Sequence, residues 1–129
     1  MVQEYKIILD TNFLLTMVRY KIHGLAGIKE NVPAKFFVLS GTIDELVGLS
    51  KSNKKIKKEF ILVEKMLEVN KVEGIKSQMS SVDDELVKKS DEFIIATNDK
   101  ELRKKIKAFG GKSIYVKKLA FVDLSEITS

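Results

Sequence analysis

Short apolar runs separated by longer amphipathic segments set the pattern of this chain. Four runs are apolar without regular alternation: Tyr5–Leu9, Phe36–Leu39, Phe93–Thr97 and Ser113–Val116. Strands that are apolar on both faces are typical of a parallel sheet covered by helices on both sides. The pattern therefore predicts an α/β protein with a parallel sheet.

The segments between these runs have helical periodicity. In Lys54–Val69, the apolar residues Ile56, Phe60, Val63 and Leu67 follow one another at helical spacing and form one face of an amphipathic helix. The other predicted helices are Asn12–Tyr20, Ile43–Leu49, Ser81–Ser90 and Lys100–Phe109.

The length of 129 residues fits one domain, residues 1–129, with a core of its own. We expect a three-layer α/β/α sandwich with a parallel sheet of four to five strands. Val72–Ile75 is either a further strand or a loop. The tail Leu119–Ile127 carries more apolar side chains than a free tail needs, so it is expected to pack on the body or on a second copy in a homodimer.

Composition limits the chemistry that the chain can perform. It has no cysteine and a single histidine, His23, which excludes disulfides, thiolate zinc sites, a cysteine nucleophile and sites with several histidines. Any enzyme built from these residues has to use carboxylates. No run approaches the ~20 apolar residues that cross a bilayer, and the first ten residues are unlike a secretory signal. A cytoplasmic protein with no membrane segment is expected.

The formal net charge of +5 is unevenly distributed along the chain. Residues 51–76 carry a net charge of +4, residues 77–99 carry −4 and residues 100–118 carry +7. Basic surfaces attract phosphate backbones regardless of sequence, although the lysines of residues 51–76 could equally be a solvated helix face. The bases expected to contact a nucleic acid strand are Lys54, Lys55, Lys100, Arg103, Lys104, Lys105 and Lys107.

Acidic residues follow three of the predicted strands. Asp10 follows the first, Glu45 lies shortly after the second, and Asp99 comes just beyond the third. In an open parallel sheet, ligands bind beyond the carboxyl ends of the strands. Bringing carboxylates together costs free energy unless protons or a cation compensate. Oxygen ligands favour Mg²⁺ or Mn²⁺, which can activate water for in-line displacement at a phosphodiester.

Each acid also has an ordinary structural explanation, because Asp and Asn commonly cap helices. Three pairs fit capping boxes: Thr42 with Glu45, Ser81 with Asp84, and Asn98 with Glu101. With Asn98 as a cap, Asp99 could point off the strand end, and with Ser81 paired to Asp84, Asp83 is the freer acid. Thr11 or Asn12 is expected to cap the first helix in place of Asp10.

Four short motifs together resemble those of the PIN-domain nucleases. The segment IILDTNFL of residues 7–14 is similar to the opening motif of that family, and Glu45 with Leu46 resembles the second motif. Asp83 at the start of a helix resembles the third, and IATNDKEL of residues 95–102 the fourth. The resemblance covers about residues 5–117. Within the family it is greatest to the small-subunit-processome nucleases and their archaeal single-domain relatives, followed by the VapC-type toxins.

The resemblance implies a Mg²⁺ or Mn²⁺ site and endonucleolytic cleavage of single-stranded RNA, with a precursor rRNA as the expected target. The alternatives are a VapC-type toxin ribonuclease and a non-catalytic RNA-binding or assembly module. The implied metal ligands are Asp10, Glu45, Asp83 and Asp99, supported by Asn12 and Thr97, with Asp84 as the alternative to Asp83. The cysteines of the processome members are absent, so any zinc-linked feature of theirs is lost.

Overall fold

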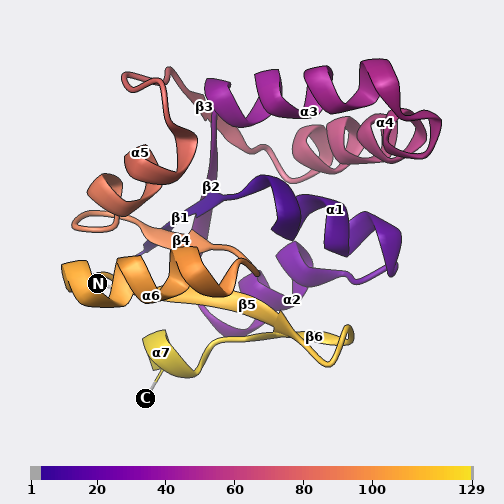
Figure 1. The fold of residues 1–129 in the computed structure, drawn as a ribbon. Helices are drawn as coiled ribbons and strands as arrows, with labels where there is room; N and C mark the ends of the chain where they lie inside the picture. Colours follow the sequence, from indigo (N-terminus) through magenta and orange to yellow (C-terminus); the bar gives the residue numbers. More distant parts are fainter. Residues whose placement is uncertain (1–3, 129) are drawn as a thin grey trace.

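A six-stranded sheet forms the centre of the protein in a computed structural model that describes residues 4–128 (Figure 1). The strands are β1 (Tyr5–Leu9), β2 (Ala34–Leu39), β3 (Glu73–Ile75), β4 (Ile94–Ala96), β5 (Ser113–Lys117) and β6 (Phe121–Asp123). They lie in the order β3-β2-β1-β4-β5-β6. All neighbouring pairs are parallel except β5 and β6, which are antiparallel.

Helices cover both faces of this sheet. They are α1 (Thr11–Arg19), α2 (Gly24–Asn31), α3 (Ser40–Ser52), α4 (Lys54–Val69), α5 (Val82–Lys89), α6 (Lys100–Phe109) and α7 (Ser125–Thr128). Figure 1 shows α5 and α6 on one side of the sheet and α1, α2 and α4 on the other. No helix within residues 4–128 combines the length and the apolar character needed to cross a membrane.

The alternating directions of strand side chains create two separate cores. Ile7 and Leu9 of β1 face the larger core, where side chains of α1, α2, α3 and α4 pack. Ile8 between them faces the smaller core, which Leu86 of α5 and Ile106 of α6 complete. Both faces of β1 are therefore buried from Ile7 to Leu9, which explains why this part of the sequence lacks the alternation of a half-exposed strand.

The predicted α/β class and layered architecture are confirmed, and the sheet has more strands than expected. Val72–Ile75, which the sequence left open, contributes β3 at one edge. Part of the tail forms β6 at the other edge, and Ile127 is buried in the larger core, so this part of the tail packs on the body. The antiparallel β6 was not foreseen, because the apolar side chains of the tail indicated packing on the body but not a strand.

An ion pair joins α1 to α4. The Arg19 guanidinium donates to both carboxylate oxygens of Glu59, each at 2.8 Å, and Glu59 is 7% exposed. These hydrogen bonds from Arg19 hold the pKa of Glu59 below its usual value. Paired charges with two hydrogen bonds are among the stronger polar interactions in proteins.

We expect Glu59→Gln to lower the free energy of unfolding by about 1–3 kcal/mol at pH 7, because it removes charge-assisted bonds to Arg19. Since the pKa of Glu59 is lowered by folding, this stabilisation is present above the unfolded pKa and is lost as pH falls below it. Urea unfolding should therefore show the difference from wild type shrinking below about pH 4. The exposed Glu64→Gln on the same helix is the control, and an equal loss there would contradict the assignment.

Candidate active site

Asp10 lies where β1 passes into α1, at the centre of the carboxyl edge of the sheet. Its backbone N–H still donates to the carbonyl of Ala96 at 2.9 Å, so the ladder between β1 and β4 extends to this residue. Because both neighbouring strands are parallel to β1, their ends bring further loops to the same edge. Asp10 is 5% exposed, an unusual environment for a carboxylate.

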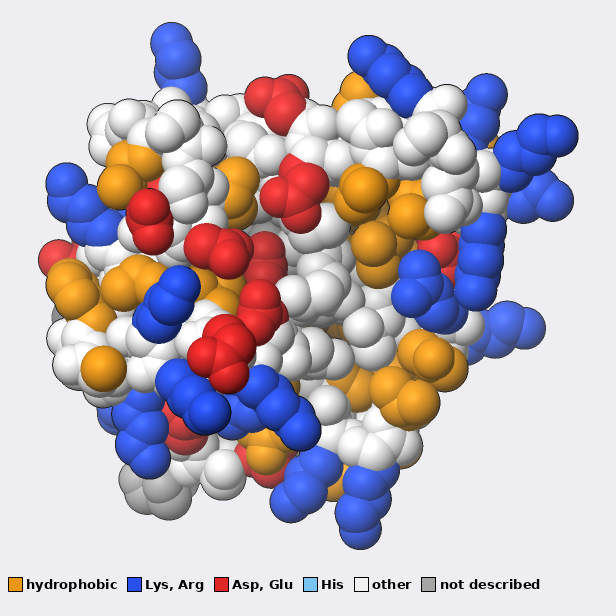
Figure 2. Space-filling view, viewed as in Figure 1, with side chains coloured by type: hydrophobic (Ala, Val, Ile, Leu, Met, Phe, Trp, Pro, Cys, Tyr) orange, Lys and Arg blue, Asp and Glu red, His pale blue; other side chains and the backbone are white. Residues whose placement is uncertain are grey.

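An open pocket of about 370 Å³ lies beside Asp10. Its lining residues come from four places in the chain, and they are Asp10, Thr11, Asn12, Leu15, Glu45, Leu49, Asp83 and Asp99. Acidic side chains gather near the middle of the face seen in Figure 2. Within residues 4–128, no three acidic or histidine side chains converge closely enough to hold a metal ion as they stand. The structure thus brings the four predicted acids to one pocket without forming a closed set of ligands.

Hydrogen bonds hold the Asp10 carboxylate in a single orientation. Its Oδ1 accepts from the backbone N–H of Thr11 at 2.8 Å. Its Oδ2 accepts from the Thr97 hydroxyl at 2.8 Å and from the Asn12 amide nitrogen at 3.2 Å. Both residues predicted to support the site, Asn12 and Thr97, therefore contact Asp10 directly.

Asn98 joins the end of β4 to its neighbours on both sides. Its backbone N–H donates to Asn12 Oδ1 at 2.8 Å, and its own Oδ1 accepts from the Val116 N–H of β5 at 2.9 Å. The predicted role of Asn98 as the cap of α6 is wrong, because β5 engages its side chain. Asp99 caps α6 instead, accepting at Oδ1 from the N–H groups of Glu101 and Leu102 at 3.0 and 3.2 Å.

Two further cap predictions are corrected by the structure. Asp10 caps α1, whereas Thr11 lies inside that helix. Thr42 lies inside α3, which begins at Ser40, and its hydroxyl has no hydrogen-bond partner within residues 4–128. The Ser81 cap of α5 is confirmed, because its hydroxyl accepts from the Asp84 N–H at 3.2 Å. Capping and lining the pocket are therefore compatible roles for Asp10 and Asp99.

Burial raises the pKa of Asp10 to about 6. The hydrogen bonds from Thr97 and Thr11 oppose this effect, whereas the negative charges of Asp83 and Glu45 add to it. A positive charge in the pocket would relieve both the burial and the repulsion between carboxylates. The pocket offers oxygen donors without sulfur or imidazole, so its donor set fits a hard cation such as Mg²⁺ or Mn²⁺.

The structure separates the two neighbouring acids at the start of α5. Asp83 lines the pocket beside Asp10, whereas Asp84 is exposed outside it. The next residue, Glu85, is 1% exposed and accepts from the backbone N–H groups of Gln78 and Met79. Sequence reasoning missed Glu85, since three adjacent acids on a polar helix show no sign of which one is buried.

Basic side chains flank the acidic pocket on two sides, below it and to its right in Figure 2. Lys54 lines a concave site at the turn between α3 and α4, together with Lys51 and Lys57. Lys55 lies beside it, and the exposed lysines of α6 are Lys100, Lys104, Lys105 and Lys107. Lys100 begins α6 directly after Asp99.

Arg103 differs from the other bases of α6, because it contacts the C-terminal segment. Its guanidinium lies 3.6 Å from the centre of the Tyr115 ring and 3.5 Å from a carboxylate oxygen of Glu126. A guanidinium stacked on an aromatic ring and paired to an acid holds these elements together. Contact between Arg103 and RNA stays a prediction.

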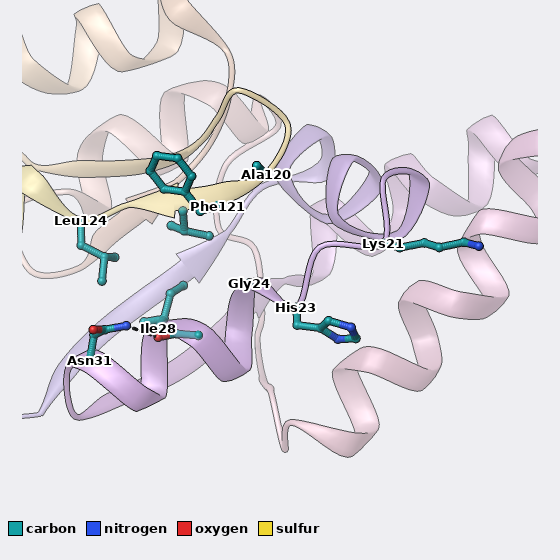
Figure 3. A pocket seen from close by; sticks show the side chains of 10 residues that line it. Lys21, His23, Gly24, Ile28, Asn31, Ala120, Phe121 and Leu124 are labelled. Carbon is teal, nitrogen blue, oxygen red and sulfur yellow. Dashed lines mark hydrogen bonds between the residues drawn. The ribbon is translucent and has the colours of Figure 1, made fainter.

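His23 lies apart from the acids, beside a second pocket between α2 and β6 (Figure 3). The labelled side chains of Ile28, Phe121 and Leu124 give this pocket an apolar lining, and the His23 ring points away from it. His23 precedes α2 without a side-chain cap hydrogen bond. The single histidine is therefore a helix-end residue, as expected.

We expect the contribution of Asp10 to the free energy of unfolding of the metal-free protein to fall as pH rises from about 4 to about 6. The unfolded chain releases the Asp10 proton near pH 3.8, whereas the folded chain retains it up to about pH 6. This difference amounts to about 3 kcal/mol once both states are ionised. Urea unfolding of wild type and Asp10→Asn across this range isolates the contribution. A stability difference that does not change with pH would contradict it.

Comparison with known proteins identifies the family to which this fold and pocket belong. The PIN-like domain family matches residues 7–118. Ribonuclease VapC4 of Methanocaldococcus jannaschii is 34% identical over an alignment of 108 residues, and the match covers 79% of this chain and 82% of the relative.

Two solved structures are also similar to the chain. The PIN domain endonuclease Utp24 superimposes with a TM-score of 0.74 at 20% identity, over 92% of this chain and 91% of that one. A domain of a functionally unknown protein from Methanocaldococcus jannaschii gives 0.60 at 14% identity, over 88% and 91%. The residues matched by the family, 7–118, include all four acids that line the pocket. The chain belongs to the PIN-like domain family.

Proposed function

We propose that this protein is a divalent-metal-dependent ribonuclease of the VapC type that cleaves single-stranded RNA. The observation that carries the proposal is the meeting of Asp10, Glu45, Asp83 and Asp99 at one pocket, with lysines on two sides. Similarity to a relative named as a ribonuclease supports the same conclusion.

A VapC-type ribonuclease is better supported than the rRNA-processing role favoured by the sequence. The 34% identity to ribonuclease VapC4 extends over most of both chains. The likeness to the Utp24 endonuclease, at 20% identity, supports the shared fold alone. Processing of a precursor rRNA therefore stays a prediction, as do a homodimer and a cytoplasmic location.

Asp10, Asp83 and Asp99 are proposed to hold Mg²⁺ or Mn²⁺, with Glu45 as a further ligand or as the group that positions water. When bound, such an ion lowers the pKa of water and stabilises negative charge on a phosphoryl oxygen. Glu45 and Asp83 are exposed, so their side chains can turn toward Asp10 without leaving a packed core. Asp10 itself is held still by the Thr97 hydroxyl and the Asn12 amide.

The polar residues in and beside the pocket have proposed roles that fit their positions. Thr97 and Asn12 donate hydrogen bonds to Asp10 Oδ2. These bonds fix the orientation of the buried carboxylate without the help of water. Asp99 uses Oδ1 to cap α6, so its second oxygen can serve the pocket. Glu45, exposed at the pocket, can accept a proton from an attacking water.

The lysines give a polyanion two regions of contact on either side of the acids. Lys54 lies at the turn between α3 and α4, and Lys100 begins α6 next to Asp99. Contacts to phosphates hold a strand without reading its bases. An RNA strand that contacts both regions would pass over the acidic pocket between them.

We expect Asp83→Asn to abolish Mn²⁺-dependent cleavage of single-stranded RNA and Asp84→Asn to retain it, because only Asp83 lines the pocket. Loss of even a neighbour of a metal ligand typically costs roughly 10- to 100-fold, so the loss for a ligand should be at least that large. Initial rates with a labelled oligonucleotide, at several Mn²⁺ concentrations, measure this.

The same assay contains the result that would reject the proposal. Equal cleavage by wild type and Asp10→Asn would mean that the activity is a contaminant or does not use this pocket. Tight RNA binding by wild type without Mn²⁺ uptake or cleavage would favour the non-catalytic RNA-binding module instead.

We expect Lys54→Ala and Lys100→Ala each to weaken RNA binding and to reduce its salt dependence. Each lost phosphate contact on a single strand should lower the slope of log K against log salt by about 0.7. Fluorescence anisotropy with the Asp10→Asn protein measures binding without cleavage. Lys6→Ala is the matched control and should keep the wild-type slope, because Lys6 is paired with Glu92 at 3.2 Å and does not line the pocket.

A further inference from the structure

Ser77 joins the beginning of α3 to the loop that precedes α5. Its hydroxyl oxygen accepts from the Gly41 N–H at 2.8 Å, and its own N–H donates to the Ser40 hydroxyl oxygen at 2.9 Å. The two bonds connect residues that lie 36 and 37 positions apart in the sequence. We call Ser40, Gly41 and Ser77 the α3–α5 clasp.

The clasp supplies a hydrogen-bond acceptor for the Gly41 N–H, in the first turn of α3, that the residues next to this helix do not supply. The N-cap position of this helix is Leu39, which makes no side-chain cap hydrogen bond. Helix beginnings leave several N–H groups without a partner in the helix. Because the Ser77 hydroxyl fills this need from a distant segment, it fixes where α3 begins relative to that segment.

Gly41 allows the close approach on which the clasp depends. A Cβ atom at this position would lie 2.9 Å from Ser77 Oγ and 2.9 Å from Val82 Cγ2. Both distances are shorter than normal contacts between such atoms, and Val82 is the first residue of α5. The beginning of α3 is thus packed against both the loop and α5.

Glu85 holds the same loop from the side of α5. Its carboxylate accepts from the Gln78 N–H at 3.1 Å and from the Met79 N–H at 3.3 Å, and Lys89 lies 3.9 Å away. A buried carboxylate with backbone donors and a nearby cation is a satisfied group. The loop is therefore attached to α3 through Ser77 and to α5 through the residues next to it.

These contacts place two of the proposed ligands relative to each other. Glu45 lies four residues after Gly41, one helical turn along α3, and Asp83 is the second residue of α5. Since no three carboxylates within residues 4–128 are close enough to hold an ion as they stand, the separation of the two helices decides whether side-chain rotation can bring them together.

We propose that Ser77 is a positioning residue for the metal site: through the α3–α5 clasp it sets the separation of Glu45 and Asp83. This inference rests on the proposed function, since it assigns these two acids to one divalent cation. Ser77 does not line the pocket, so it acts through the two helices rather than by touching the ion or the RNA.

The test is Ser77→Ala in the full chain, with Mn²⁺ as the probe. We expect Mn²⁺ affinity, measured from the electron paramagnetic resonance signal of the free ion, to fall about 10- to 100-fold, as for other partners of metal-binding side chains. Hydrogen exchange of the metal-free protein should show faster exchange at the Gly41 amide. Half-maximal RNA cleavage should need a correspondingly higher Mn²⁺ concentration.

Ser80→Ala, an exposed serine of the same loop, is the matched control and should keep wild-type Mn²⁺ affinity. Ser40→Ala removes only the reciprocal bond and should lower affinity in the same direction. If Ser77→Ala does not fold, the Mn²⁺ affinity of Ser40→Ala tests the positioning role in its place. If these variants have a lower melting temperature but unchanged Mn²⁺ affinity, the clasp stabilises the fold without positioning the metal site, and the inference is wrong.

The two proposals can fail separately. If wild type binds Mn²⁺ and cleaves RNA while folded Ser77→Ala matches it in both, the positioning role alone is wrong. If wild type binds no Mn²⁺ and cleaves no RNA, the proposed function falls, and the positioning role falls with it.

Discussion

Burial of the Asp10 carboxylate, among other acids at one edge of the sheet, is the constraint around which this site is organised. Parallel strands end at the same edge of the sheet, so the acids that follow them are brought together although like charges repel. Burial raises the pKa of Asp10 to about 6, and the negative charges of Asp83 and Glu45 add to this effect. The hydrogen bonds from Thr97, Asn12 and the Thr11 N–H offset part of this cost. A cation would offset the remainder, which links the stability of the pocket to its proposed chemistry.

The elements around the pocket differ in how firmly they hold their acids. Asp10 and Asp99 are each fixed by capping a helix, and Asn98 connects their loops to β5. Glu45 and Asp83 are exposed side chains, held only through the placement of α3 and α5. Asp10 and Asp99 are therefore fixed by hydrogen bonds, whereas the exposed side chains of Glu45 and Asp83 have room to rotate. This division suits the proposed site, which would admit an ion and a strand of RNA.

Much of the site could be anticipated from the sequence, and the errors concern local hydrogen bonding. Asp10 and Asp99 were expected at strand ends, and they lie there. Asn98 was expected to cap α6, yet it binds the Val116 N–H, and Asp99 takes the cap. Asn and Asp have similar cap preferences, so the choice between adjacent residues depends on a strand that arrives later in the chain. Glu85 and Ser77 went unnoticed because their hydrogen bonds, to a loop and to the beginning of α3, leave no periodic pattern in the sequence.

The sequence by itself determined the α/β class, because continuous apolar strands separated by amphipathic helices can bury their surfaces in few other ways. It also limited the chemistry to carboxylates and hard cations through the absence of cysteine and the single histidine. Only the tertiary structure decided that Asp83 rather than Asp84 lines the pocket, that β6 closes one edge, and that Ser77 meets Gly41. The periodicity of apolar residues shows which face of a helix or strand is buried. It does not show which distant segment of the chain packs against that face.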